Sequence, residues 1–206
     1  MALENFLTYT EVDPNNRYAV AANTITVTGL KANEDAWVVG DKGAGHFGDF
    51  VHDVDVNWSA STADSRGVVW AVSNVIDDAK FWVTNASQAL AVIVAGMSTE
   101  RRLYFFNTED ASYPYIVWSL GAKYYRVTRV GASCVVTAYS DAARTNLTGQ
   151  INGSAPAART YRYVFGVNSQ NAGVAAATSF TVANLNLNEP TPIAIFHHHC
   201  KLLARP

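Results

Sequence analysis

The sequence predicts an all-β protein folded as one antiparallel β-sandwich, and three observations carry this prediction. Apolar and polar residues alternate with period two along most of the chain, which is typical of half-buried strands. No long stretch sustains the apolar stripe of an amphipathic helix. Turn-forming residues separate the alternating runs at the short intervals usual in sandwiches, and no repeat of fixed period favours a solenoid or a propeller.

Residues 50–58 give the clearest predicted strand. Its alternation places Asp53, Asp55 and Asn57 on one face. The opposite face carries the residues Phe50, His52, Val54, Val56 and Trp58. We therefore expect the apolar face to be buried in the core and the face with the aspartates to be exposed to solvent. Further strands, rich in β-branched and aromatic residues, are predicted at 24–30, 36–39, 67–72, 89–95, 103–106, 115–120, 124–129, 134–139, 161–167 and 178–187.

The last part of the chain differs from the rest. Residues 188–192 read Asn-Glu-Pro-Thr-Pro and cannot continue a β-ladder, because proline has no amide donor. We therefore expect a sandwich domain over residues 1–187 and an extended arm over residues 188–206. The arm is too apolar for a solvated linker, so it should dock on its own sheet or on a neighbouring chain. We expect the neighbouring chain, contacted through Ile193, Ile195, Phe196, Leu202 and Leu203.

The composition points to contacts with protein or sugar. Hydrophobic residues make up 49% of the chain and charged residues only 16%, so the surface carries few charges. The net charge of −2, with no basic stripe, argues against nucleic acid as a partner. The two cysteines stand far apart and predict neither a disulfide framework nor a zinc site.

No segment is expected to enter a membrane or to direct export. No apolar run approaches the roughly 18 residues of a spanning helix. Glu4 stands where a secretory signal would carry a basic residue. We therefore expect a protein that is made in a cytoplasm, is not inserted in a membrane, and leaves the cell by another route such as lysis.

Five stretches carry a resemblance to a known family. They are Tyr-Thr-Glu-Val-Asp-Pro-Asn at 9–15, Glu-Asp-Ala-Trp-Val at 34–38, Gly-Asp-Phe at 48–50, and the blocks 124–131 and 138–145. In their order along the chain they resemble the concanavalin A-like lectin/glucanase superfamily, in the compact form found in phage and metagenomic proteins. The resemblance implies a jelly roll of two curved sheets whose concave face often binds glycans, but this fold serves many functions.

The same resemblance indicates which residues a glycosidase of this superfamily would need. Laminarinase-like members carry glutamates at both ends of the strand that matches 50–58, as acid and nucleophile, with an aspartate between them. Here the end positions are Asp53 and Asn57. An amide can be neither a nucleophile nor a general base, so retaining hydrolysis would lack one carboxylate. We therefore expect no catalytic residues and no enzyme activity.

A glycan site, if the chain has one, is expected on the polar strand face. By alternation its candidates are Asp53, Asp55, Asn57, Tyr124, Arg126 and Arg162. The competing interpretation of this face is a solvated surface with no ligand. Most tryptophans are expected in the core.

The sequence leaves open whether the chain binds a metal ion. Asp35, Asp41, Asp77 and Asp78 lie near strand ends and could hold calcium, as in lectins of the superfamily, but they are equally good turn formers. Of the triplet at 197–199, only His197 and His199 would share a strand face, so a metal ion there would need more ligands. No cofactor is expected.

Three classes of function compete. We expect a non-catalytic structural or adhesive protein of a phage particle, as a capsid decoration or a tail-associated lectin-like domain. It would reside in the virion, form a homo-oligomer, and contact other virion subunits and, by its lectin-like fold, cell-surface glycans. The alternatives are a free carbohydrate-binding module and a laminarinase-like glycoside hydrolase.

Overall fold

The computed structural model describes residues 3–110 and 112–188 of the chain. Within them the elements are η1 (Phe6–Thr8), β1 (Thr10–Val12), β2 (Tyr18–Ala21), β3 (Thr24–Lys31), β4 (Trp37–Asp41), β5 (Phe50–Ser61), β6 (Arg66–Ser73), α1 (Ala79–Thr84), β7 (Ala89–Gly96), β8 (Arg101–Asn107), β9 (Tyr115–Trp118), β10 (Gly121–Val130), β11 (Ser133–Tyr139), β12 (Leu147–Ser154), β13 (Tyr163–Asn168) and β14 (Ala177–Asn188). None of the described helices is long and apolar enough to cross a membrane.

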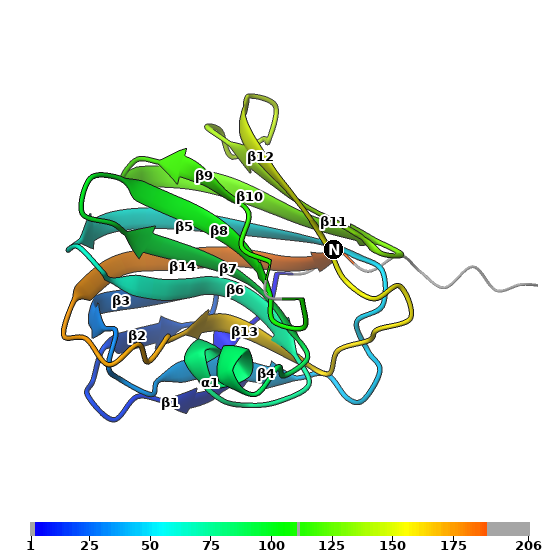
Figure 1. Ribbon diagram of the computed structural model, residues 1–206, viewed down its shortest axis with the longest axis horizontal. Coiled ribbons are helices and arrows are strands. Elements are labelled where there is room, and N and C mark those ends of the chain that lie inside the picture. Colours follow the sequence, from blue (N-terminus) through cyan, green and yellow to red (C-terminus); the bar gives the residue numbers. More distant parts are fainter. Residues whose placement is uncertain (1–2, 111, 189–206) are drawn as a thin grey trace, which may run out of the picture.

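Two sheets of seven strands pack face to face (Figure 1). Sheet A has the order β1-β4-β13-β6-β7-β8-β9, and sheet B the order β12-β11-β10-β5-β14-β3-β2. Their neighbouring strands run antiparallel. β14, which follows all the other strands in the described sequence, lies inside sheet B between β5 and β3. The predicted all-β sandwich is therefore confirmed.

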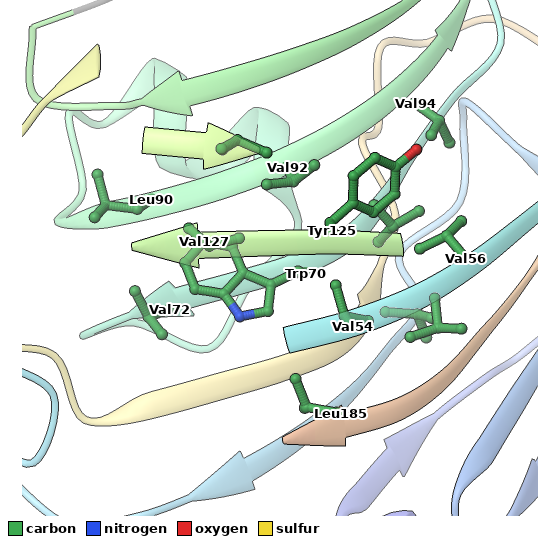
Figure 2. Packing of buried hydrophobic residues seen from close by; sticks show 14 of the residues in the cluster. Val54, Val56, Trp70, Val72, Leu90, Val92, Val94, Tyr125, Val127 and Leu185 are labelled. Atoms are coloured by element: carbon green, nitrogen blue, oxygen red, sulfur yellow. The ribbon is translucent and has the colours of Figure 1, made fainter. Parts of the chain in front are cut away.

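The core lies between the sheets and follows from strand alternation. The five predicted inward residues of β5, from Phe50 to Trp58, are at most 2% exposed. Trp70, Val92 and Tyr125 meet them from the facing and neighbouring strands (Figure 2). Burial of so many large side chains, each contributing about 1.5–3 kcal/mol, is the main source of stability.

Sheet A is also covered on part of its outer face. Helix α1 lies over β13 and β4 (Figure 1) and packs Trp82 edge-on against Phe165, with 4.9 Å between the ring centroids. The carboxylate of Asp78 caps the helix by accepting hydrogen bonds from the amides of Lys80 and Phe81, at 2.7 and 3.3 Å. The same outer cluster includes Ala89, Ala91 and Ile93 of β7, a strand whose residues are all buried.

Two glycines let aromatic rings of the other sheet approach the backbone. A Cβ atom at Gly67 of β6 would lie 2.5 Å from the Phe180 ring, and one at Gly153 of β12 would lie 2.4 Å from the Phe105 ring. Any larger residue at either position would force the ring to move.

The predicted strands are all present, but the sequence analysis missed β1, β2, β12 and α1. β1 has three residues and β2 has four, too few for a clear alternation. β12 is largely polar and contains two glycines, so it was not predicted as a strand. Asn188, the first residue of the predicted arm, still belongs to β14 and pairs with Val51. The apolar residues of the arm lie outside the described residues, so its docking stays a prediction.

Candidate functional site

The predicted polar face lies on the outside of sheet B. Register pairs Arg126 of β10 with Asp53 and Tyr124 with Asp55, so these side chains share one face, as predicted. The Arg126 guanidinium donates two hydrogen bonds to Asp53, from Nε to Oδ1 (2.8 Å) and from Nη2 to Oδ2 (2.9 Å). This bond raises the pKa of Arg126. Asn57 is exposed at the far end of the same face.

A second arginine, which the sequence analysis missed, closes the site. Arg144, in the loop between β11 and β12, donates from Nη2 to Oδ1 of Asp55 (2.7 Å). Its Nε also lies 3.5 Å from Oδ1 of Asp53. Asn184 of β14 donates to the other oxygen of Asp55 (2.8 Å). Both aspartates are therefore paired with arginines through charge-assisted hydrogen bonds.

The loop that carries Arg144 is held in shape by Asp141. The Asp141 carboxylate accepts hydrogen bonds from the amides of Asn146 (2.6 Å) and Thr145 (3.1 Å). These bonds, that of Asn146 foremost, lower the pKa of Asp141. Arg144 itself has a φ of 55°, which is uncommon for a residue other than glycine. This loop conformation directs the Arg144 side chain toward Asp55 of β5.

Arg162 does not join the face on which it was predicted. Its guanidinium pairs with Asp41 at the end of β4, in sheet A, through Nε to Oδ1 (2.9 Å) and Nη2 to Oδ2 (2.6 Å). The bond from Arg162 lowers the pKa of Asp41 to about 2. The reason for the wrong placement is topological. β13, which begins directly after Arg162, pairs with β4 and β6, and Tyr161 before it pairs with Phe47, so this segment does not pair with β5 or β10.

The aspartates considered for calcium each have another partner. Asp35 accepts a hydrogen bond from Asn171 (2.9 Å), Asp77 accepts one from the amide of Asp78 (2.8 Å), and Asp78 caps α1. Among the described residues, no group of three or more His, Cys, Asp or Glu side chains is placed to hold a metal ion. His197, His199 and Cys200 lie outside these residues.

A groove of about 330 Å³ lies elsewhere, on the outer face of sheet A beside α1. Its walls combine apolar or aromatic residues (Val83, Ile93, Ala95, Met97, Tyr104, Phe106 and Tyr113) with three polar ones (Arg66, Lys80 and Gln170). A mostly apolar hollow with a few polar groups is the usual composition of a small-molecule site, and such sites begin at about 300 Å³.

Strand register explains why the outer face is hollow at this point. Ala95 of β7 pairs with Arg66 of β6 on one side and with Arg102 of β8 on the other. Ala91, four pairs further along the same ladder, faces Phe106. Small residues on the central strand between large residues on both neighbours leave a depression.

An aromatic group flanks the groove. The Tyr104 and Tyr115 rings are 5.3 Å apart, and the Phe106 and Tyr113 rings 4.4 Å apart. The Arg102 guanidinium stacks over Tyr115 at 4.1 Å and donates to the Tyr104 hydroxyl (3.0 Å). These contacts fix the rings in place before any ligand binds. No sequence pattern marked this site, because it requires the pairing of three strands.

Two buried polar residues support the fold and do not belong to either site. The Arg129 guanidinium donates to the carbonyls of Gly48 (2.8 Å) and Pro156 (2.9 Å) and so joins two loops. His52, completely buried, accepts a hydrogen bond at Nδ1 from the Trp70 indole (3.2 Å). Burial lowers the pKa of His52 to about 3, so the imidazole is neutral.

Comparison with known proteins identifies the fold. No protein-family model and no curated protein sequence matches the chain. Among solved structures, a legume lectin-like domain from Entamoeba histolytica matches with a TM-score of 0.62 at 10% identity, over 89% of this chain and 90% of that chain. A functionally unknown protein from Saccharomyces cerevisiae matches with a TM-score of 0.61 at 13% identity, over 91% and 99%.

A third match is the VIP36 exoplasmic/lumenal domain in its form bound to Ca²⁺ and Man3GlcNAc, with a TM-score of 0.54 at 8% identity, over 92% of this chain and 90% of that chain. The chain thus has the concanavalin-like jelly-roll fold, as the resemblance implied. At these identities the likeness concerns the fold alone.

Proposed function

We propose that this protein is a non-catalytic, lectin-like domain that binds part of a glycan in the groove on the outer face of sheet A. One observation carries the proposal: the groove combines the fixed ring of Tyr104 with Phe106, Tyr113 and a few polar side chains. Sugar rings present apolar C–H faces and polar hydroxyls, so they match a surface of aromatic rings edged by hydrogen-bonding groups. The lectin-like fold of the chain agrees with this function.

The pairing of the carboxylates supports the non-catalytic part of the proposal. A retaining glycosidase needs two carboxyl groups about 5 Å apart and facing the substrate. In this chain Asp53 and Asp55 are occupied by Arg126, Arg144 and Asn184. We expect no release of reducing sugar from β-glucans. Activity that disappears in Asp53→Asn and Asp55→Asn variants would contradict this part of the proposal.

The binding test uses the full chain on an array of neutral and acidic glycans. Binding should be lost in Tyr104→Ala, because the stacking surface is removed, and kept in Tyr124→Ala. Tyr124 is a matched control, being a half-buried tyrosine on the outer face of sheet B. The opposite result, with loss only in Tyr124→Ala, would place the glycan on the strand face with Asp53. Binding of no glycan at all would refute the proposed function.

A second candidate function is that of a structural subunit, for example of a phage particle, and a different surface supports the association between subunits that this function needs. β9 and β12 are the outermost strands on one side of the sandwich, where Ile116 reaches the backbone at Gly149. Val117 and Leu147 in these strands are 62% and 61% exposed. Exposed apolar residues on unpaired strand edges favour association between subunits. Light scattering after chromatography tests it: the wild type should be oligomeric, and a Val117→Lys, Leu147→Lys double variant monomeric.

A further inference from the structure

The charge of the groove is the observation that goes beyond general glycan binding. Arg66 and Lys80 both line it, and no aspartate or glutamate does. Within residues 3–110 and 112–188, neither cation has a hydrogen bond or an ion pair. The groove therefore holds two uncompensated positive charges, although the whole chain carries a net charge of −2.

Arg66 differs in this respect from the other arginines. Each remaining arginine in the described part of the chain donates at least one hydrogen bond: Arg17, Arg101, Arg102, Arg126, Arg129, Arg144, Arg159 and Arg162. The arginine next to Arg66 across Ala95, Arg102, is held by Glu100 and Tyr104. Among the arginines of residues 3–110 and 112–188, Arg66 alone thus keeps all its guanidinium donors for a ligand.

The position of Arg66 matches a ligand that is both flat and anionic. Arg66 stands on β6 at one side of the hollow above Ala95, and Tyr104 stands on β8 at the other side. A sugar ring lying in the hollow would contact the tyrosine ring and present its substituents to the guanidinium. A guanidinium binds a carboxylate through two parallel hydrogen bonds, which neither a hydroxyl nor a neutral ring can match.

We propose that the groove selects sugars that carry a carboxylate, such as uronic acid residues, with Arg66 as the residue that determines this specificity and Lys80 as a second cation. This inference rests on the proposed function, since it names the class of glycan that the same groove would take. Gln170 adds an uncharged hydrogen-bonding group on the groove wall.

The experiment compares two oligosaccharides that differ only at C6. The full chain is titrated calorimetrically, at low salt, with a β-1,4-linked glucose tetrasaccharide and with its glucuronate counterpart. A hydrogen bond to a charged group contributes enough for a preference of about tenfold or more for the glucuronate. The preference should shrink as salt is added, because the charges are partly solvent-exposed. If the glycan array shows tighter binding of a sugar with another linkage, that sugar replaces the tetrasaccharides. Its carboxylated form and its neutral form are then compared in the same way.

Variants connect the preference to the residue. Arg66→Gln should remove the preference, so that the glucuronate and the glucose tetrasaccharide bind with about equal affinity. Arg162→Gln removes the same charge from an exposed arginine outside the groove and should keep the preference. Unchanged far-UV circular dichroism and melting temperature show that both variants are folded.

Each alternative result has a distinct meaning. Equal binding of acid and neutral sugars, with Tyr104→Ala still abolishing it, would overturn the carboxylate specificity and leave the proposed function standing. Binding of sulfated but not carboxylated sugars would overturn the assignment of the anion. Equally tight binding of a polyglutamate peptide would overturn sugar as the ligand class. Absence of any binding would refute both proposals together.

Discussion

The buried imidazole of His52 should make the protein lose stability in mild acid. In the folded chain the pKa of His52 is about 3, because the side chain lies among Phe47, Phe50 and Trp70 and is completely buried. In the unfolded chain its pKa returns to about 6.5. Above pH 6.5 both states are neutral and the residue has no pH-dependent effect. Below pH 6.5 only the unfolded state takes up the proton, so the free energy of unfolding falls with pH.

The magnitude follows from the two pKa values. Below the unfolded pKa, each pH unit costs about 1.4 kcal/mol until the folded pKa is reached. Between pH 7 and pH 5 the loss from His52 alone is about 2 kcal/mol. This figure is the same for any folded pKa below about 4, so it does not depend on the depth of the shift.

Urea unfolding of the wild type and of His52→Gln at pH 7, 6 and 5 measures this loss. Glutamine can still accept the Trp70 hydrogen bond but does not titrate, so the variant should lose about 2 kcal/mol less than the wild type over this range. If His52→Gln lost as much stability as the wild type between pH 7 and pH 5, or if NMR showed His52 titrating near its ordinary pKa, the reasoning would be refuted.

Three further predictions concern stability and assembly. Asp78→Ala removes the cap of α1 and should lower the free energy of unfolding by about 1 kcal/mol in urea titrations, with Asp78→Asn closer to the wild type. Arg129→Met leaves the buried carbonyls of Gly48 and Pro156 without their donor and should cost about 3 kcal/mol or more, whereas a loss under 1 kcal/mol would show that water replaces the guanidinium. A chain ending at Glu189 should keep its β-type circular dichroism and melt cooperatively, since β14 ends at Asn188. It should fail to assemble, because the arm is removed. Unfolding of this shortened chain, or its normal assembly in light scattering, would show that the arm is not an inter-subunit contact.

The faces of the long strands could be predicted from the sequence, but the sites built across strands could not. The alternation of β5 is local and correctly separated His52 from Asp53. The ion pair of Asp53 with Arg126 depends on a register that joins residues 73 positions apart, which no local pattern specifies. The groove is harder still, because it needs the alignment of β6, β7 and β8 and the cover of α1.

Some of the missed features did leave a signal in the sequence. Asp78 followed by Ala-Lys-Phe-Trp-Val is a capping residue before a short helical run, although a turn at Asp77 and Asp78 fits the same letters. Gly153, which weakened the strand pattern of β12, is required there by the Phe105 ring. The glycine that argued against a strand was therefore a consequence of the packing between the two sheets.

The interior position of β14 in sheet B has a consequence for the order in which the chain can fold during synthesis. β5 receives its partner on one side only when residues 177–188 have been made, and the Trp58 indole then donates to the Thr178 hydroxyl (2.8 Å) across 120 positions of sequence. Contacts between such distant residues make folding slow, because the loop must close before the contact stabilises anything. Until then β5 and β3 carry unpaired edges that can join a strand of another nascent chain. Yield in expression should therefore depend on how soon the final strand reaches its place, and not only on the stability of the finished domain.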